Sequence, residues 1–210
     1  MKRIAWLAVC TLTLMAFANS ALADGPDPGT IHIKKLSWAG SGCAPGTAVA
    51  DLSNDAMAFT LIFSEFLAQI GPDIPLSEAR KNCQVNVLLH VPQGFTFAVF
   101  AADYRGFANL ARGAKGMQKA IYYFQGDSPQ SSSWRTFRGA MDNDWQLHDE
   151  LDEAFLVWSP CGVSRSLNIN TQVRLEKGTA SSSSSSIMTM DSEDLSIRQV
   201  FHIRWRRCTR

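Results

Sequence analysis

Apolar and polar residues alternate along several stretches of the chain, a period-two pattern typical of strands that cover a core with one face. The clearest runs are residues 85–91, 167–175 and 201–205. Residues 59–63 and 95–99 follow the same pattern with a more apolar second face. Weaker strand candidates are residues 31–36, 47–52, 120–124, 154–158 and 187–190. The pattern therefore predicts an all-β protein of about ten short strands.

Turn-forming residues separate these runs. Gly40-Ser41-Gly42, Ala44-Pro45-Gly46 and Ser159-Pro160-Cys161-Gly162 are examples. Pro92-Gln93-Gly94 lies between two alternating runs and predicts a hairpin. Residues 63–70 and 149–155 are the two segments that suit a helix, but neither has a convincing pair of caps. An antiparallel β-sandwich is the fold we expect.

The N-terminus has the organisation of a secretory signal peptide. Lys2 and Arg3 precede an apolar stretch at residues 4–17, which is too short to span a bilayer comfortably. Small residues then precede Ala23, after which we expect cleavage. The chain would thus divide into a signal peptide, residues 1–23, and a single secreted domain, residues 24–210. No other apolar run approaches membrane-spanning length, and we expect an extracellular or periplasmic location.

Removal of the signal peptide leaves a nearly neutral protein. Without Lys2 and Arg3, 18 basic residues stand against 19 acidic ones, a formal charge of −1. Proteins that bind nucleic acid through their main surface are usually strongly basic. Nucleic acid is therefore not an expected partner.

The mature chain has an even number of cysteines, as expected for disulfides in an exported protein. They are Cys43, Cys83, Cys161 and Cys208. No two lie close together in the sequence and no histidine stands at ligand spacing beside one, which argues against a zinc site. Four cysteines allow three pairings. We predict the sequential one, which joins Cys43 to Cys83 and Cys161 to Cys208 and closes two separate loops bracketed by turns.

The densest acidic stretch runs from Asp142 to Glu153. A hydrolase would draw two of its carboxylates as general acid and as base or nucleophile. A solvated loop leading into the strand candidate at residues 154–158 is the simpler interpretation. Residues 142–144 lack the glycine and distal glutamate of a calcium loop, and the histidines are scattered. We therefore predict no catalytic residue, no metal ligand and no cofactor.

Two tryptophans, Trp134 and Trp145, lie in polar sequence that resembles loops. An exposed indole ring is costly without a purpose, and it can stack on a sugar ring. Trp134 and Trp145 are therefore the candidate binding residues.

Several short motifs recur in the order in which they occur in a known family. They are Gly42-Cys43-Ala44-Pro45-Gly46, Phe59-Thr60-Leu61-Ile62-Phe63, Arg80-Lys81-Asn82-Cys83-Gln84, Tyr104-Arg105-Gly106, Trp158-Ser159-Pro160-Cys161-Gly162 and Leu167-Asn168-Ile169-Asn170-Thr171. Together they resemble the small secreted proteins of fungi and bacteria grouped as domain of unknown function 4360. The resemblance covers about residues 31–208 and implies a secreted, cysteine-paired domain. It implies no activity, so it assigns no catalytic residue.

The function we expect is that of a non-catalytic binding or surface-associated module. Its expected partner is a cell-wall polysaccharide or a surface protein, and the polysaccharide interpretation depends mainly on Trp134 and Trp145. The alternative is a carbohydrate-active hydrolase that uses carboxylates of the 142–153 stretch.

The leader predicts that the exported protein begins at Asp24, because signal peptidase reads the small residues at positions 21 and 23. N-terminal sequencing of protein recovered from the medium or periplasm checks this. A mature chain that still begins at Met1 would contradict the prediction.

Overall fold

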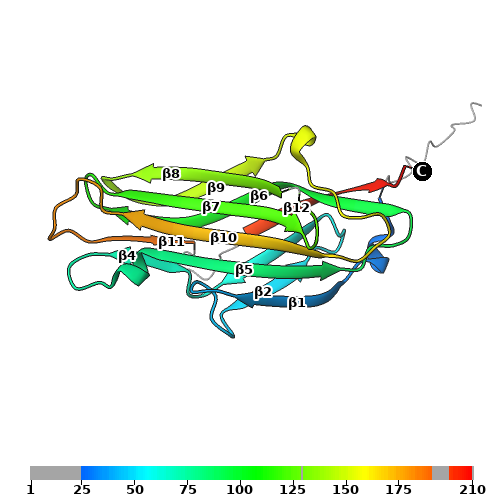
Figure 1. The fold of residues 1–210 in the computed structure, drawn as a ribbon, viewed down its shortest axis with the longest axis horizontal. Helices are drawn as coiled ribbons and strands as arrows, with labels where there is room; N and C mark the ends of the chain where they lie inside the picture. Colours follow the sequence, from blue (N-terminus) through cyan, green and yellow to red (C-terminus); the bar gives the residue numbers. More distant parts are fainter. Residues whose placement is uncertain (1–24, 129, 191–198, 210) are drawn as a thin grey trace, which may run out of the picture.

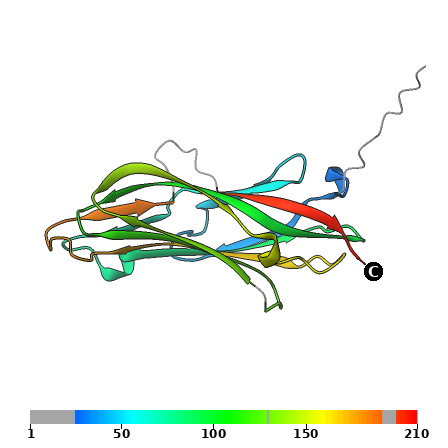
Figure 2. The same ribbon diagram turned by 90° about the horizontal axis from the view of Figure 1, so that it is seen from above.

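The computed structural model describes residues 25–128, 130–190 and 199–209, and in these ranges the chain forms two antiparallel β-sheets packed face to face (Figures 1 and 2). The predicted signal peptide, residues 1–23, lies outside the described residues. Short 3₁₀ turns connect some strands: η1 (Pro28–Thr30), η2 (Leu76–Ala79) and η3 (Glu153–Phe155). The predicted all-β, antiparallel sandwich is confirmed.

The smaller sheet, sheet A, has five strands in the order β1 (Ile33–Ala39), β5 (Arg80–Leu89), β10 (Ser166–Glu176), β7 (Lys115–Phe124) and β8 (Gln130–Arg138). The larger sheet, sheet B, has the order β2 (Ala48–Leu52), β3 (Ala58–Phe63), β12 (Gln199–Arg207), β6 (Phe95–Leu110), β11 (Ser186–Thr189) and β4 (Leu67–Ile70). A seventh strand of sheet B, β9 (Met141–Glu150), pairs with the other edge of β6.

Alternation decides which residues of each strand meet the core. In β5, Val85, Val87 and Leu89 are buried, whereas Gln84 and Asn86 between them are partly exposed on the outer face. The expected strands at residues 31–36, 47–52, 59–63, 85–91, 95–99, 120–124, 167–175, 187–190 and 201–205 all overlap observed strands. A period-two pattern is therefore a sufficient signal for these nine strands.

The core is rich in aromatic side chains that join the two sheets. Phe201 of β12 stacks on Phe59 of β3 with ring centroids 4.8 Å apart, and it meets Tyr104 of β6 edge-on. The ring of Tyr122, on sheet A, lies 5.9 Å from the same phenylalanine. Burial of each large apolar side chain stabilises the fold by roughly 2 kcal/mol, so this cluster holds the sheets together.

Two disulfides have the predicted pairing. Cys43 bonds to Cys83 with Cα atoms 5.6 Å apart, and Cys161 bonds to Cys208 with Cα atoms 5.9 Å apart. The first ties the turn before β2 to β5, and the second ties the turn before β10 to the end of β12. Each closes a loop long enough to stabilise the fold by about 4 kcal/mol in the chain-entropy model.

The expected hairpin at Pro92-Gln93-Gly94 is wrong. β5 pairs with β1 and β10 in sheet A, whereas β6 pairs with β9, β11 and β12 in sheet B. The turn, with Gly94 at φ +82°, does reverse the chain. A turn of this sequence can join two strands of one sheet, or it can carry the chain from one sheet to the other. The local sequence pattern is the same in both cases, so it does not distinguish them.

Two further expectations fail around η3 and β4. Residues 154–158 form no strand, because the Asp152 carboxylate accepts a hydrogen bond from the Ala154 amide at 2.9 Å and caps η3. The helix candidates at residues 63–70 and 149–155 contain β4, the end of β9 and η3 instead. Strands β4, β8 and β9 were not anticipated.

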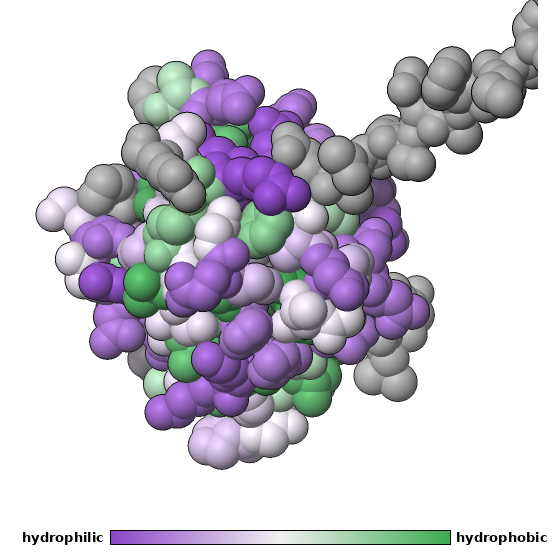
Figure 3. All heavy atoms as spheres, turned by 90° about the vertical axis from the view of Figure 1, so that its right-hand side faces the viewer, coloured by the Kyte–Doolittle hydropathy of each residue, from purple (hydrophilic) through white to green (hydrophobic). Residues whose placement is uncertain are grey.

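The end of the molecule at the right of Figure 1, where the C-terminal strand ends, is covered mainly by hydrophilic side chains with small apolar areas between them (Figure 3). Among residues 25–128, 130–190 and 199–209, no helix has the length and apolar character needed to cross a membrane.

Replacement of Val87 by Asp should lower the free energy of unfolding by about 4 kcal/mol or more, because it buries an unpaired carboxylate at a fully buried position. Urea denaturation of the purified variant measures the loss. The matched control is Asn86→Asp on the opposite face of β5, for which we expect less than about 1 kcal/mol. Equal losses for the two variants would contradict the strand assignment.

Candidate ligand-binding face

Side-chain amides gather on the outer face of sheet A. They come from alternate positions of two neighbouring strands and lie in register: Asn168 opposite Asn86, Asn170 opposite Gln84, and Gln172 opposite Asn82. We call these six residues the amide face. The positions between them on β5 and β10 point into the core, so the alternation that builds the core also places the amides outside.

Hydrogen bonds between neighbouring strands orient the amides. The Asn170 Nδ2 donates to Gln84 Oε1 at 3.0 Å, and the Gln84 Nε2 donates to Asn168 Oδ1 at 3.5 Å. On the other side, the Asn86 Nδ2 donates to Ser37 Oγ of β1 at 3.5 Å. Each amide group has two donor hydrogens and an acceptor oxygen. These contacts therefore leave capacity for a ligand while limiting side-chain freedom.

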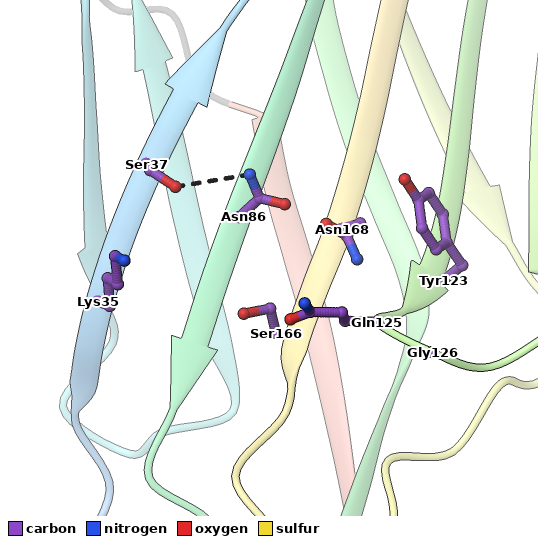
Figure 4. A pocket seen from close by; sticks show the side chains of 8 residues that line it. All are labelled: Lys35, Ser37, Asn86, Tyr123, Gln125, Gly126, Ser166 and Asn168. Atoms are coloured by element: carbon purple, nitrogen blue, oxygen red, sulfur yellow. Dashed lines mark hydrogen bonds between the residues drawn. The ribbon is translucent and has the colours of Figure 1, made fainter.

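A hollow of about 380 Å³ opens at one end of the amide face (Figure 4). Its lining comes from four strands and the turn after β7: Lys35, Ser37, Asn86, Tyr123, Gln125, Gly126, Ser166 and Asn168. Asn168 forms the floor and is 6% exposed although it points outward. Its amide nitrogen faces the hollow in Figure 4 and has no hydrogen-bond partner among the described residues. A donor that faces a hollow and has no protein partner suits a hydroxyl ligand.

Two aromatic side chains share this outer face. Trp134 of β8 is 61% exposed and lies opposite Lys119 of β7. Tyr123 lies further along β7, borders the hollow and pairs with Gln130. Because Trp134 lies opposite Lys119, it is four residues from Tyr123 along the strand direction, a distance of about 13 Å. Trp134 is thus an exposed ring as expected, although it lies in a strand and not in a loop.

Trp145, the other expected binding residue, is buried. It occupies an inward position of β9, is 4% exposed, and packs against Phe137 with ring centroids 5.2 Å apart. It also lies beneath Gly106, where an added Cβ would approach its ring to 2.5 Å. The expectation that this ring is free to stack on a sugar is therefore wrong, because its polar neighbours belong to the opposite face of the strand.

The acidic stretch does not form the solvated loop that its composition suggested. Asp142, Asp144 and Glu150 lie on the outer face of β9, whereas Asp149 points inward and is 5% exposed. Since β9 sends its carboxylates to opposite sides of sheet B, they do not form a facing acid–base pair. Asp149 and Glu150 are adjacent in the strand and therefore point to opposite faces, so only Asp149 lies in the interior.

Asp149 is held at the open edge between the sheets. Its carboxylate accepts a charged hydrogen bond from Arg135 Nη2 at 2.9 Å and a hydrogen bond from Ser133 Oγ at 2.5 Å, both from β8. Burial, reinforced by the charge of Asp149, raises the pKa of Tyr122 nearby. A carboxylate with this pairing is a structural link between β8 and β9.

A second polar cluster lies on the outer face of sheet B, where the fold unites histidines that are scattered in the sequence. Asp103 of β6 accepts from His148 at 2.6 Å and from His202 at 2.7 Å. Burial opposes ionisation of Asp103, but the hydrogen bonds from His202 and His148 outweigh it and lower its pKa. The same contact with Asp103 raises the pKa of His148. Only the strand pairing could reveal this cluster.

Metal binding finds no support in residues 25–128, 130–190 and 199–209. Within those ranges, no group of three or more His, Cys, Asp and Glu side chains is arranged to hold a metal ion.

Two solved structures give alignments over most of the chain, at low similarity. They are the enzymatically active domain of bacteriophage CBA120 tailspike protein 4 (15% identity, 87% of this chain, 20% of that chain, TM-score 0.25) and TmCBM61 in complex with beta-1,4-galactotriose (9% identity, 84% and 90%, TM-score 0.26). At these TM-scores neither resemblance bears on fold or function.

A relative from Arthroderma benhamiae, described as an uncharacterized secreted protein, is 48% identical over 186 residues. The match covers 89% of this chain and 75% of the relative. Together with the two disulfides, it identifies this chain as a secreted protein. The family model for the Domain of unknown function DUF4360 matches residues 29–208. The chain therefore belongs to the DUF4360 family.

Proposed function

We propose that this secreted protein is a non-catalytic module that binds a polysaccharide on the outer face of sheet A. The observation that carries the proposal is the amide face itself, together with the two aromatic rings of Tyr123 and Trp134 beside it. Amides and aromatic rings on one rigid sheet suit a ligand with many hydroxyl groups and apolar ring faces.

The chemistry of the face matches that of sugars. Each Asn or Gln can donate to one hydroxyl and accept from another, so neighbouring amides can address neighbouring hydroxyls of one ring. Tyr123 and Trp134 offer π-faces for the C–H side of a sugar ring. Their separation of about 13 Å along the strand direction exceeds the size of one ring, which favours a polymer over a monosaccharide.

Rigidity adds to the fit. The amides lie on two central strands of sheet A, each paired on both sides, and are joined by their own hydrogen bonds. Binding therefore costs little ordering of side chains or backbone, which favours affinity from individually weak contacts.

The alternative hydrolase has less support. Four of its candidate carboxylates lie on β9, in the other sheet, and are divided between the two faces of that strand. Asp152 and Glu153 follow in the cap and first residue of η3. The Asp149 carboxylate is already engaged by Arg135 and Ser133. A protein partner at the cell surface is the remaining alternative, and the binding experiments below separate it from a polysaccharide.

Replacement of Tyr123 or Trp134 by Ala should weaken polysaccharide binding about fivefold or more, since loss of one ring stack costs roughly 1 kcal/mol. Pull-down on insoluble polysaccharides measures the bound fraction. Phe107→Ala, on the outer face of sheet B, is the matched control and should bind as the parent does. If the parent binds no polymer, the proposal fails and a protein partner takes its place.

Asp144→Asn and Glu150→Gln should leave both binding and stability nearly unchanged, because both side chains are exposed on the far sheet. A reducing-sugar assay on the parent and both variants accompanies the pull-down. Removal of a general acid or base would cost at least about 100-fold in rate. Sugar release by the parent that is lost in either variant would refute the binding-module proposal and support the hydrolase.

A further inference from the structure

Charge is distributed unevenly over the two outer faces of the sandwich. Outward positions of sheet A carry basic side chains from every strand: Lys35, Arg80, Lys115, Lys119, Arg138 and Arg174. Glu176 is the one acidic residue at the outward positions of these strands, and it pairs with Arg174 at 3.2 Å. The outward positions of β9 on sheet B carry Asp142, Asp144 and Glu150 instead. A chain that is nearly neutral as a whole therefore presents one distinctly basic face.

The basic side chains of sheet A are available to a ligand. Apart from Arg174, none of them has an ion-pair partner in the described part of the chain. A cross-strand ion pair would be a structural reason for a cation on a strand, and these side chains form none among the described residues. Because lysine and arginine only donate hydrogen bonds, they remain free to bind acceptor groups of a ligand. Protection of a sheet edge explains Arg138 on β8, but it does not explain Lys119 or Arg80, which lie on inner strands.

One row across sheet A brings the three kinds of side chain together. Trp134 lies opposite Lys119, Lys119 opposite Gln172, and Gln172 opposite Asn82. Directly opposed residues have Cβ atoms about 5 Å apart. An aromatic platform, a cation and two amides thus follow one another over four neighbouring strands, with Arg174 at the next outward position of β10.

We propose that the polysaccharide bound by this face is acidic, a polymer of uronic acid residues. The inference rests on the proposed function and assigns its ligand class. A uronate ring stacked on Trp134 places its carboxylate within reach of Lys119 on the next strand. Gln172 and Asn82 lie two and three strands from Trp134, about 10 and 14 Å away, so they meet hydroxyl groups of neighbouring residues of the polymer. The remaining cations raise the local concentration of a polyanion and speed its association. The carboxylates of β9 disfavour contact of the same polymer with that edge of sheet B.

The test compares polygalacturonate with its methyl ester, because the two share a backbone and differ in charge. The protein should bind polygalacturonate at least about tenfold more tightly, and the difference should shrink at about 0.5 M salt, where exposed charges are screened. Lys119→Gln should weaken binding to polygalacturonate about fivefold and leave binding to the ester unchanged. Arg105→Gln removes the same charge from the exposed outer side of sheet B and should change neither.

Several outcomes would overturn the inference. These are equal affinity for the acid and the ester, equal effects of the Lys119 and Arg105 substitutions, or equally tight and salt-sensitive binding of a DNA duplex. If the neutral ester or another neutral polymer still binds and Trp134→Ala still weakens it, the polysaccharide-binding proposal stands without the acidic preference. If neither charged nor neutral polymers bind, both proposals fail. Melting temperatures within a few degrees of the parent's show that each variant is folded.

Discussion

Packing of the two inner faces, centred on Phe201, is the constraint on which the rest of the molecule depends. Tyr122 from sheet A and Phe59 and Tyr104 from sheet B surround that ring. Because side chains alternate between the faces of a strand, burial of one set assigns the other set to the outside. A slip of one residue in β5 or β10 would move the amides into the core and expose valine and isoleucine. The composition of the binding face is thus a direct consequence of core packing.

The perimeter of the sandwich is closed by other means. Disulfides fasten the turns before β2 and β10 to β5 and to the end of β12. At the edge formed by β8 and β9, the Arg135–Asp149 pair and Ser133 join the strands through polar contacts, beside the apolar contact of Phe137 with Trp145. Because the core, the disulfides and the contacts between β8 and β9 stabilise the fold, the side chains on the outer face of sheet A are available to bind a ligand.

The pattern of the sequence is informative where a strand alternates strictly and fails where polar residues interrupt the apolar positions. β5, β10 and β12 follow strict alternation and were anticipated. β8 places Ser131, Ser133 and Arg135 inward, so it shows no apolar period. In β9 the residues on either side of Trp145 are polar because they lie on the outer face, so the local sequence wrongly predicts an exposed ring. Polar pairs formed between strands distant in the sequence cannot be recognised from local spacing.

The same reasoning explains what was missed at the candidate site. Asn86, Asn168 and Tyr123 are unremarkable as single residues, because polar residues are expected on the solvent side of any strand. Only the register of β5, β10 and β7 shows that they adjoin one another around a hollow. The exposure of Trp134 follows from the polar sequence around it, but the same argument fails for Trp145, which is buried.

The central claim is that ligand contacts are confined to the outer face of sheet A. Its most direct test is an NMR titration of isotope-labelled protein with an oligomer of galacturonic acid, in which side-chain amide and indole signals are followed. The account predicts that the signals of Gln84, Asn168, Asn170, Gln172 and Trp134 shift together with one dissociation constant, while those of Trp145 and of the outer face of sheet B do not. Shifts centred on β9 or on the Asp103–His148–His202 cluster, with the amide signals unmoved, would contradict it.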